Sequence, residues 1–382
     1  MTSDIYSNFF NNHSYGQLSL CHHSLFDFIL AKIKNNGKKH NLSIIETNSS
    51  KHAGNKLRRV LNNNRFIGHT IQHDIKNKIT KNQFVCFILK HVNHDLNLKL
   101  ILTLYLSRDI IDVNHELSYL SHITHIVDTI ADIFICTKRH HIKQTKQIDI
   151  DLIIIHNNCN KNFVNNQLNA NNINSGSCIA FDSIVIWRTE EILKVLIHEL
   201  IHFFMLDFGN CAGSDIDFSK KLFGVSNDVL NESFTDSFAI IIHTLFVAYY
   251  SNNNNKLDLF NQEINFVLFQ AAKIINTYNV DIANQSTFRN IKQSTSAFSY
   301  YIVKAALLCN FVNLCNFVDD FLFHSHYDIS KFILFVMQSM NSDSFVQAIS
   351  HYLSIVNNKQ TKNKIFNQLL FRTLRMTHLS IY

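Results

Sequence analysis

Two histidines and a glutamate within one short stretch have the types and the spacing of a metal-hydrolase site. The stretch is His198-Glu199-Leu200-Ile201-His202, which reads H-E-x-x-H. Residues four apart in a helix lie about 40° from each other around its axis, so both imidazoles can bind one ion. Zinc favours neutral imidazole nitrogen, and a glutamate one position along can take a proton from zinc-bound water. The motif predicts a catalytic zinc centre with His198 and His202 as metal ligands and Glu199 as general base.

The residues around the motif bear on a plainer alternative, in which the helix carries two satisfied histidines and a surface glutamate. The flanking residues Val195, Leu196, Ile197, Phe203 and Phe204 are all apolar. Two imidazoles and a carboxylate buried there without partners would cost several kcal/mol. A bound metal ion supplies the partner, so the composition of the helix favours a metal site.

A catalytic zinc ion needs a third protein ligand. The chain has eight cysteines but no C-x-x-C pair, so a cysteine-based zinc site is not expected. The metzincin pattern would place a glycine at position 205 and a histidine at 208, where this chain has Met205 and Phe208. Farther on, Glu232 and Asp236 lie on one face at the start of an otherwise apolar predicted helix. A second interpretation of these acids is that the helix dipole favours negative charge there.

The two motifs together, H-E-x-x-H at 198–202 and N-E-x-x-x-D at 231–236, resemble the signature of the gluzincins, the thermolysin-like zinc peptidases. The resemblance implies Glu232 as the third zinc ligand, and Asp236 as the acceptor from the other ring nitrogen of a zinc histidine, His198. It also implies the zincin plan of a mixed sheet, the motif helix and an all-α lobe. In that plan strand 183–187 is the edge strand that pairs with an extended peptide. The G-x-M-E-N motif of one aminopeptidase branch is absent.

Peptide hydrolysis also benefits from a donor to the developing oxyanion, commonly a tyrosine, histidine or arginine. Tyr300 and Tyr301, on a predicted helix of the second half, are the candidate catalytic donors in this sequence. Their alternative role is aromatic packing. His243 lies on the same helical face as Glu232, and it either approaches the site or is a core histidine.

The elements that must position these residues are a sheet in the first half of the chain and helices in the second. In order, the patterns predict hairpin strands 84–91 and 98–106, helix 115–130, strands 148–155 and 183–187, the motif helix 189–206, and helices 229–250, 257–278, 296–311, 330–340 and 344–355. We expect Thr189 to cap the motif helix, with Glu190 and Glu191 in its first turn. The predicted fold class is α+β and zincin-like. Residues 1–207 form an α+β lobe with a mixed sheet, and residues 208–382 form an all-α lobe that carries the third zinc ligand.

The composition of the chain bears on its turns and its setting. The 382 residues include no proline and only eight glycines, and Asn, Ile, Lys and Phe, the residues of A/T-rich codons, are abundant. Turns must therefore be marked by Asn, Gly and Ser. The bias suits a large DNA virus or another A/T-rich genome. We see no signal peptide and no apolar stretch long enough to span a bilayer, so we expect an intracellular, cytoplasmic protein or one carried in a virion.

The net charge of +6 permits contact with nucleic acid or anionic membranes. The basic residues are dispersed, however, and their densest groups are not interleaved with stacking aromatics. These groups are Lys56, Arg58, Arg59 and Arg65, then Lys138, Arg139, Lys143 and Lys146. A solvated surface is the favoured interpretation. Nucleic-acid binding is a weaker hypothesis, and no membrane contact is expected.

Together these patterns predict a zinc-dependent metallopeptidase that acts on a peptide or protein substrate, with Zn2+ as its cofactor. The alternative is a catalytically inactive structural or interaction protein on a zincin fold, in which zinc serves stability. Structural zinc sites are closed by four protein ligands, and three candidates are found here, which favours catalysis. The sequence makes no prediction of the oligomeric state.

Overall fold

The computed structural model of the chain contains two compact units. It describes residues 9–10, 15, 23–37, 42–48, 51–107, 113–137, 147–157, 159–163, 166–208, 212–324, 329–358 and 370–380. The sheet unit comprises Ala31–Asn160 and Ile173–Leu206, and the helical unit comprises Met1–Leu30, Lys161–Asn172 and Asp207–Tyr382. The predicted division after residue 207 lies within one residue of a boundary between these units. Residues 1–30 and 161–172 group with the helices rather than with the sheet.

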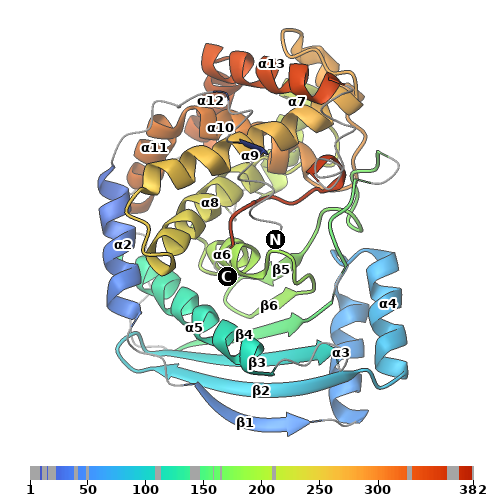
Figure 1. The fold of residues 1–382 in the computed structure, drawn as a ribbon, viewed down its shortest axis with the longest axis vertical. Helices are drawn as coiled ribbons and strands as arrows, with labels where there is room; N and C mark the ends of the chain where they lie inside the picture. Colours follow the sequence, from blue (N-terminus) through green and yellow to red (C-terminus); the bar gives the residue numbers. More distant parts are fainter. Residues whose placement is uncertain are drawn as a thin grey trace. The chain divides into compact units, whose positions relative to one another are not determined.

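One six-stranded mixed sheet forms the centre of the sheet unit, in the order β1-β2-β3-β4-β6-β5 (Figure 1). The strands are β1 Leu42–Asn48, β2 Phe84–Asn93, β3 Leu98–Ser107, β4 Ile148–Ile155, β5 Gly176–Ile179 and β6 Ser183–Ile186. Strands β1, β2 and β3 pair antiparallel, and β2 and β3 confirm the predicted hairpin. Strand β4 pairs parallel with β3 and with β6, and β5 returns antiparallel beside β6.

The edge of this sheet is formed by a different strand from the one expected. Strand β6, the predicted edge strand 183–187, is hydrogen-bonded on both sides, to β4 and to β5. Strand β5 therefore lies at one edge of the sheet and β1 at the other. The sequence did not indicate β5, because Gly-Ser-Cys-Ile is too short and too poor in β-branched residues to register as a strand.

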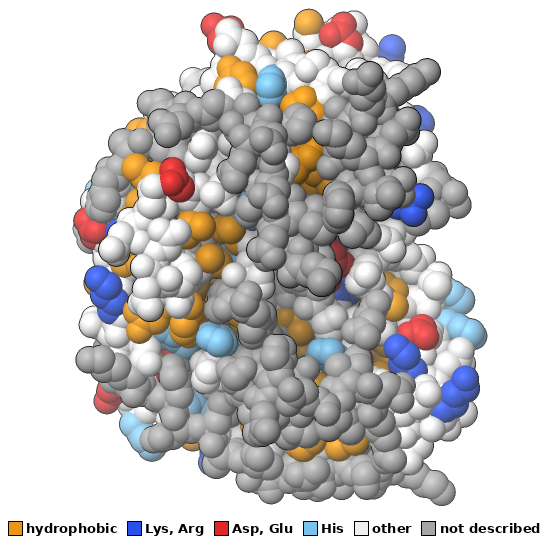
Figure 2. Space-filling model, viewed as in Figure 1, with side chains coloured by type: hydrophobic (Ala, Val, Ile, Leu, Met, Phe, Trp, Pro, Cys, Tyr) orange, Lys and Arg blue, Asp and Glu red, His pale blue; other side chains and the backbone are white. Residues whose placement is uncertain are grey.

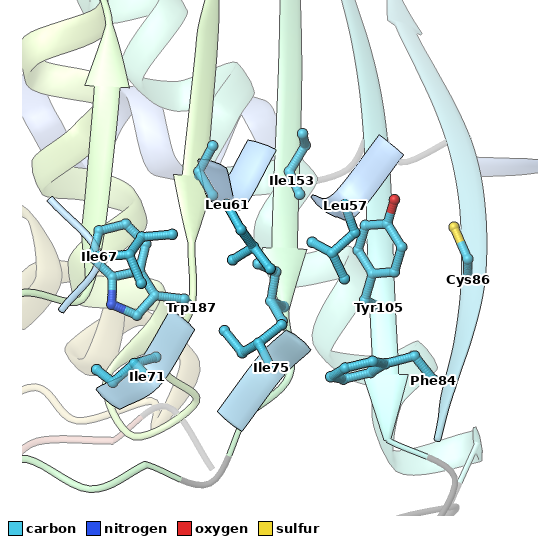
Figure 3. Packing of buried hydrophobic residues seen from close by; sticks show 12 residues of the cluster. Leu57, Leu61, Ile67, Ile71, Ile75, Phe84, Cys86, Tyr105, Ile153 and Trp187 are labelled. Atoms are coloured by element: carbon cyan, nitrogen blue, oxygen red, sulfur yellow. The ribbon is translucent and has the colours of Figure 1, made fainter. Parts of the chain in front are cut away.

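Helices cover both faces of the sheet. Helices α3 (Lys51–Asn63) and α4 (His69–Thr80) pack over one face, where they share a buried cluster with the strands (Figure 3). The cluster contains Leu57, Leu61, Ile67, Ile71, Ile75, Phe84, Cys86, Tyr105, Ile153, Ile155, Val185 and Trp187. Alternate strand residues point to opposite faces. His91 of β2 accordingly points away from the cluster, and its Nε2 lies 2.9 Å from Oδ1 of Asp128 in helix α5 (Val113–Cys136).

The helical unit is built almost wholly from helices, and its described residues include no named strand. Its helices after residue 207 are α7 Ala212–Phe223, α8 Asn231–Tyr250, α9 Lys256–Thr277, η3 Gln285–Asn290, η4 Phe298–Val303, α10 Lys304–Cys309, α11 Phe311–Phe323, α12 Ile329–Met340 and α13 Asp343–Asn357. Helix α13 packs along α9, and η4 contacts α8, α9 and α10. Earlier in the chain, α2 spans Ser24–Asn36. The named elements among the described residues after 207 are all helices.

One predicted helix, 296–311, is divided in the structure. Its first part is the π-helix η4, which is followed directly by the short α-helix α10. The hydrogen bonds of a π-helix span five residues rather than four, and such segments are found often at functional sites. Both candidate tyrosines, Tyr300 and Tyr301, lie on η4.

Asparagine marks many of the turns, as the composition predicted. Among the described non-glycine residues with a positive φ angle, six are asparagines: Asn82, Asn97, Asn166, Asn227, Asn252 and Asn279. The short polar side chain of asparagine can hydrogen-bond locally and tolerates the left-handed conformation better than most side chains do. Asparagine thus takes the role that glycine usually has.

The surface offers no concentrated basic patch in the view of Figure 2, where the described Lys and Arg side chains are scattered. In the first basic group, Lys56 lies 3.9 Å from Asp151 and Arg58 donates to Thr80. The second group, 138–146, lies outside the described residues.

Among the described helices, none alone has the length and apolar character to cross a membrane, although the bent pair Phe298–Cys309 and Phe311–Phe323 meets both criteria together.

A buried carboxylate ties the start of α8 to η4. Asp228 accepts hydrogen bonds from Ser219 Oγ at 2.8 Å, from Ser299 N at 3.1 Å and from Ser299 Oγ at 2.6 Å. Burial raises the pKa of this carboxyl above its ordinary value, although the hydrogen bonds act in the opposite direction. The folded chain therefore binds the Asp228 proton more tightly than the unfolded chain does.

This shift gives the stability a pH dependence of known sign. The contribution of Asp228 is fully present below its unfolded pKa, about pH 4, and is lost as pH rises through its higher folded pKa. Asp228→Asn keeps the shape but has no proton to lose. In urea unfolding between about pH 4 and pH 8, we expect the wild type to lose stability relative to this variant as pH rises. A relative gain by the wild type would contradict the raised pKa.

Candidate metal centre

The predicted zinc motif lies on α6 (Ile192–Phe203), a helix of the sheet unit that is buried almost throughout. The helix is shorter than the predicted 189–206, and Thr189 does not cap it. Instead, Thr189 Oγ1 donates to the carbonyl of Asn157 at 3.4 Å, and Glu191 takes the N-cap position without a side-chain cap bond. Glu190 and Glu191 therefore precede the helix and do not lie in its first turn.

The end of α6 is fixed directly after the motif. Met205 has a φ of 49°, and its N–H donates to the carbonyl of His202 at 3.0 Å. The N–H of Leu206 donates to the carbonyl of Ile201 at 2.9 Å. This is a Schellman-type end, which satisfies carbonyls that the last helical turn leaves open.

The two histidines of the motif are brought together as predicted. Their Nε2 atoms lie 3.1 Å apart, with ring centroids 4.7 Å apart and ring planes at 77°. Two nitrogen ligands on a tetrahedral zinc ion, with bonds of about 2.0–2.1 Å, would lie about 3.3 Å apart. The pair therefore fits a zinc ion with little movement. A direct hydrogen bond between the rings fits the same distance.

Glu199 is buried beside an edge strand that leaves it no spare room. A Cβ atom at Gly176 of β5 would lie 2.5 Å from Glu199 Oε1, 2.9 Å from Glu199 Cγ and 2.8 Å from Val195 Cγ1. Only glycine lets the β5 backbone approach α6 this closely. Gly176 therefore belongs to the packing of the predicted general base.

This contact can be tested without any assay of function. Gly176→Ala should destabilise the fold by about 1–3 kcal/mol through overpacking. The cost should be smaller in a chain that also carries Glu199→Ala, because truncation removes both glutamate atoms that the new methyl group would meet. Urea unfolding of the wild type, the two single variants and the double variant gives this coupling energy. An equal cost of the alanine in both backgrounds would show that Glu199 does not pack there.

In the helical unit, Glu232 is half-buried in the first turn of α8. The residues beside it are anchored by the buried Asp207. Asp207 Oδ2 accepts from Asn231 Nδ2 at 3.3 Å and from Thr235 Oγ1 at 2.9 Å. Asn231 Oδ1 in turn accepts from the N–H of Phe208 at 3.2 Å. The start of α8 is thus held on both sides of Glu232.

Asp236, one turn farther along α8, has a partner that the sequence did not indicate. Lys304 Nζ lies 2.6 Å from Asp236 Oδ2, and the two side chains are 1% and 0% exposed. The pair joins residues far apart in sequence, so spacing alone could not reveal it. The predicted role of Asp236 as acceptor from a zinc histidine remains a prediction.

The candidate oxyanion donors differ in their surroundings. Tyr301 is fully buried, and its hydroxyl donates to the carbonyl of Leu374 at 2.5 Å. Its one hydroxyl proton is engaged there, so packing describes Tyr301 better than catalysis does. Tyr300 is half-buried on the same helix and keeps the candidate role. His243 is buried in α8, in keeping with a core histidine.

Comparison with known proteins adds one weak similarity. The chain is 23% identical over 207 residues to an uncharacterised protein of Acanthamoeba polyphaga mimivirus, a match that covers 48% of this chain and 50% of the viral protein. The chain thus spans about half the length of that relative. The similarity to a giant-virus protein fits the large DNA virus suggested by the composition. No protein-family profile matches the chain, and no solved structure matches it.

Proposed function

We propose that the protein is a zinc-dependent metallopeptidase of the gluzincin type. The observation that carries this proposal is the 3.1 Å separation of the His198 and His202 Nε2 atoms on one helix, next to the buried Glu199. Glu232 is the proposed third ligand. The resemblance of the N-E-x-x-x-D segment at 231–236 to the gluzincin signature supports Glu232 in this role.

The donor set suits zinc in its chemistry as well. Two neutral imidazoles and one carboxylate form the three-ligand set of many catalytic zinc sites, which leaves a position for water or substrate. A bound zinc ion would polarise the scissile carbonyl as a Lewis acid. Glu199 would take the proton of the attacking water and pass it to the leaving amine. Tyr300 would donate to the developing oxyanion.

Strand β5 is the proposed holder of the peptide substrate. It lies at the edge of the sheet and pairs on one side with β6. An extended peptide can add to such an edge through main-chain hydrogen bonds. Gly176 of β5 lies against Glu199, so a peptide paired with β5 would lie close to the general base. This assignment replaces β6 as the peptide-binding strand.

The first test is zinc content and turnover in Glu199→Gln. We expect about one zinc ion per chain in both the wild type and the variant, because Glu199 is not a ligand. Turnover of a peptide library should fall by about 10²–10⁴-fold in the variant, since the general base is lost. Elemental analysis of protein purified without a histidine tag and peptide mass spectrometry give the two readouts.

The outcomes separate the proposal from its rival. Zinc in the wild type without turnover of any peptide would favour the alternative, a structural protein stabilised by zinc. Absence of zinc from the folded wild type, with no uptake from buffered zinc, would defeat both. Undiminished turnover in Glu199→Gln would remove Glu199 from its role.

A second test concerns Glu232 alone. Glu232→Ala should weaken zinc binding by at least about 10-fold, because two protein ligands hold zinc less well than three. Glu190→Ala is the matched control, since it removes the same charge just before α6 without removing a proposed ligand. Competition with a chelator measures both affinities. Equal zinc affinity in Glu232→Ala and the wild type would exclude Glu232 from the ligand set.

A further inference from the structure

One buried ammonium group joins three parts of the helical unit. Lys304 lies where η4 passes into α10, and its Nζ is 2.6 Å from Asp236 Oδ2 of α8. It also donates to the carbonyl of Met376 at 3.5 Å, and it lies 5.9 Å from the centroid of the Tyr301 ring. Both charged side chains are almost completely buried. An ion pair this deep is strongly held, because removal of either partner leaves a buried charge without compensation.

The segment 370–380, drawn in red in Figure 1, is held by hydrogen bonds to its main-chain carbonyls. The hydroxyl of Tyr301 donates to the carbonyl of Leu374, and Lys273 Nζ donates to the carbonyls of Leu370 and Thr373. The side chains of Leu370 and Leu374 have no exposed surface. Since main-chain carbonyls are the acceptors, these bonds fix the path of the segment. Lys304 is therefore held from two sides, by this segment and by α8.

The ion pair between Lys304 and Asp236 also restrains Glu232, which lies on the same helix. The two acids are one helical turn apart, in the first turns of α8. The carboxylate of Asp236 is bound by Lys304, so the first turns of α8 cannot rotate or slide without breaking a buried ion pair. Asp207 holds the other residues of the same turns through Asn231 and Thr235.

We propose that Lys304 is a positioning residue for Glu232, the proposed third zinc ligand, and that it acts through Asp236 to fix the first turns of α8. The inference rests on the proposed zinc site. Residues behind metal ligands orient them, and loss of such a partner usually lowers metal affinity about 10–100-fold. Lys304 lies one step farther back than Asp236, and it has no ligand atom of its own to offer zinc.

Lys273 is a matched control for this proposal. It is a second buried lysine of the helical unit and binds the same segment, through the carbonyls of Leu370 and Thr373. Its Nζ also lies 5.6 Å from the centroid of the Phe269 ring. Burial lowers the pKa of Lys273 well below its ordinary value. Replacement of Lys273 thus loosens the segment without touching Asp236.

The experiment compares the wild-type chain with its Lys304→Met and Lys273→Met variants. Zinc affinity is measured by chelator competition, and the visible absorption of the cobalt-substituted proteins reports ligand geometry. Thermal unfolding of each metal-free protein measures its loss of stability. We expect Lys304→Met to weaken zinc at least about 10-fold and to change the cobalt spectrum. We expect Lys273→Met to stay within about threefold of the wild type with an unchanged spectrum, despite lower stability.

Two results would overturn the inference. One is wild-type zinc affinity and cobalt spectrum in Lys304→Met. The other is an equal loss in Lys273→Met, which would trace the effect to the loosened segment. If Lys304→Met does not fold, Lys304→Gln, which keeps a donor and removes the charge, is judged by the same criteria. Failure of the wild type to bind zinc would instead defeat the proposed function itself, so the two failures are distinguishable.

Discussion

Polar side chains inside the apolar helices of this chain need partners, and the positions of those partners determine how the candidate site is built. A buried charge without a partner costs several kcal/mol, more than most single contacts return. The helix α8 buries Asp236 completely, and Lys304 compensates its charge from another helix. The buried Asp228 likewise receives hydrogen bonds from serines of α7 and η4. Each such pairing ties elements that are distant in sequence.

Local patterns in the sequence were sufficient to predict a helix or strand whose conformation depends on its own residues. The β2–β3 hairpin, β4 and most long helices follow from runs and periodicities that packing did not override. The spacing of His198 and His202 is also local, and the helix brings their rings together as expected. Helices α3 and α4 were not predicted, because their polar residues outnumber the apolar ones. Their few apolar residues form a buried face only when they pack on the sheet.

Features that depend on distant residues could not be found in the same way. The order of the strands is decided by pairing, so no local pattern indicated that β6 would lie between β4 and β5. Gly176 is important because Glu199 packs against it, and Lys304 is important because it forms an ion pair with Asp236. The left-handed turns at asparagine are an intermediate case. Their residue type was predicted from composition, but their positions come from the chain path.

The shortness of β5 has a consequence for how the protein behaves in a crowded solution. An open strand edge invites a second copy of the same chain to pair with it, which is a common route to aggregation. Strand β5 is only four residues long, and a stacked copy would gain few main-chain hydrogen bonds there. Ile179 at its end is 64% exposed, so the edge is apolar there but short. A strand of this length can bind a peptide briefly while giving the protein little tendency to polymerise.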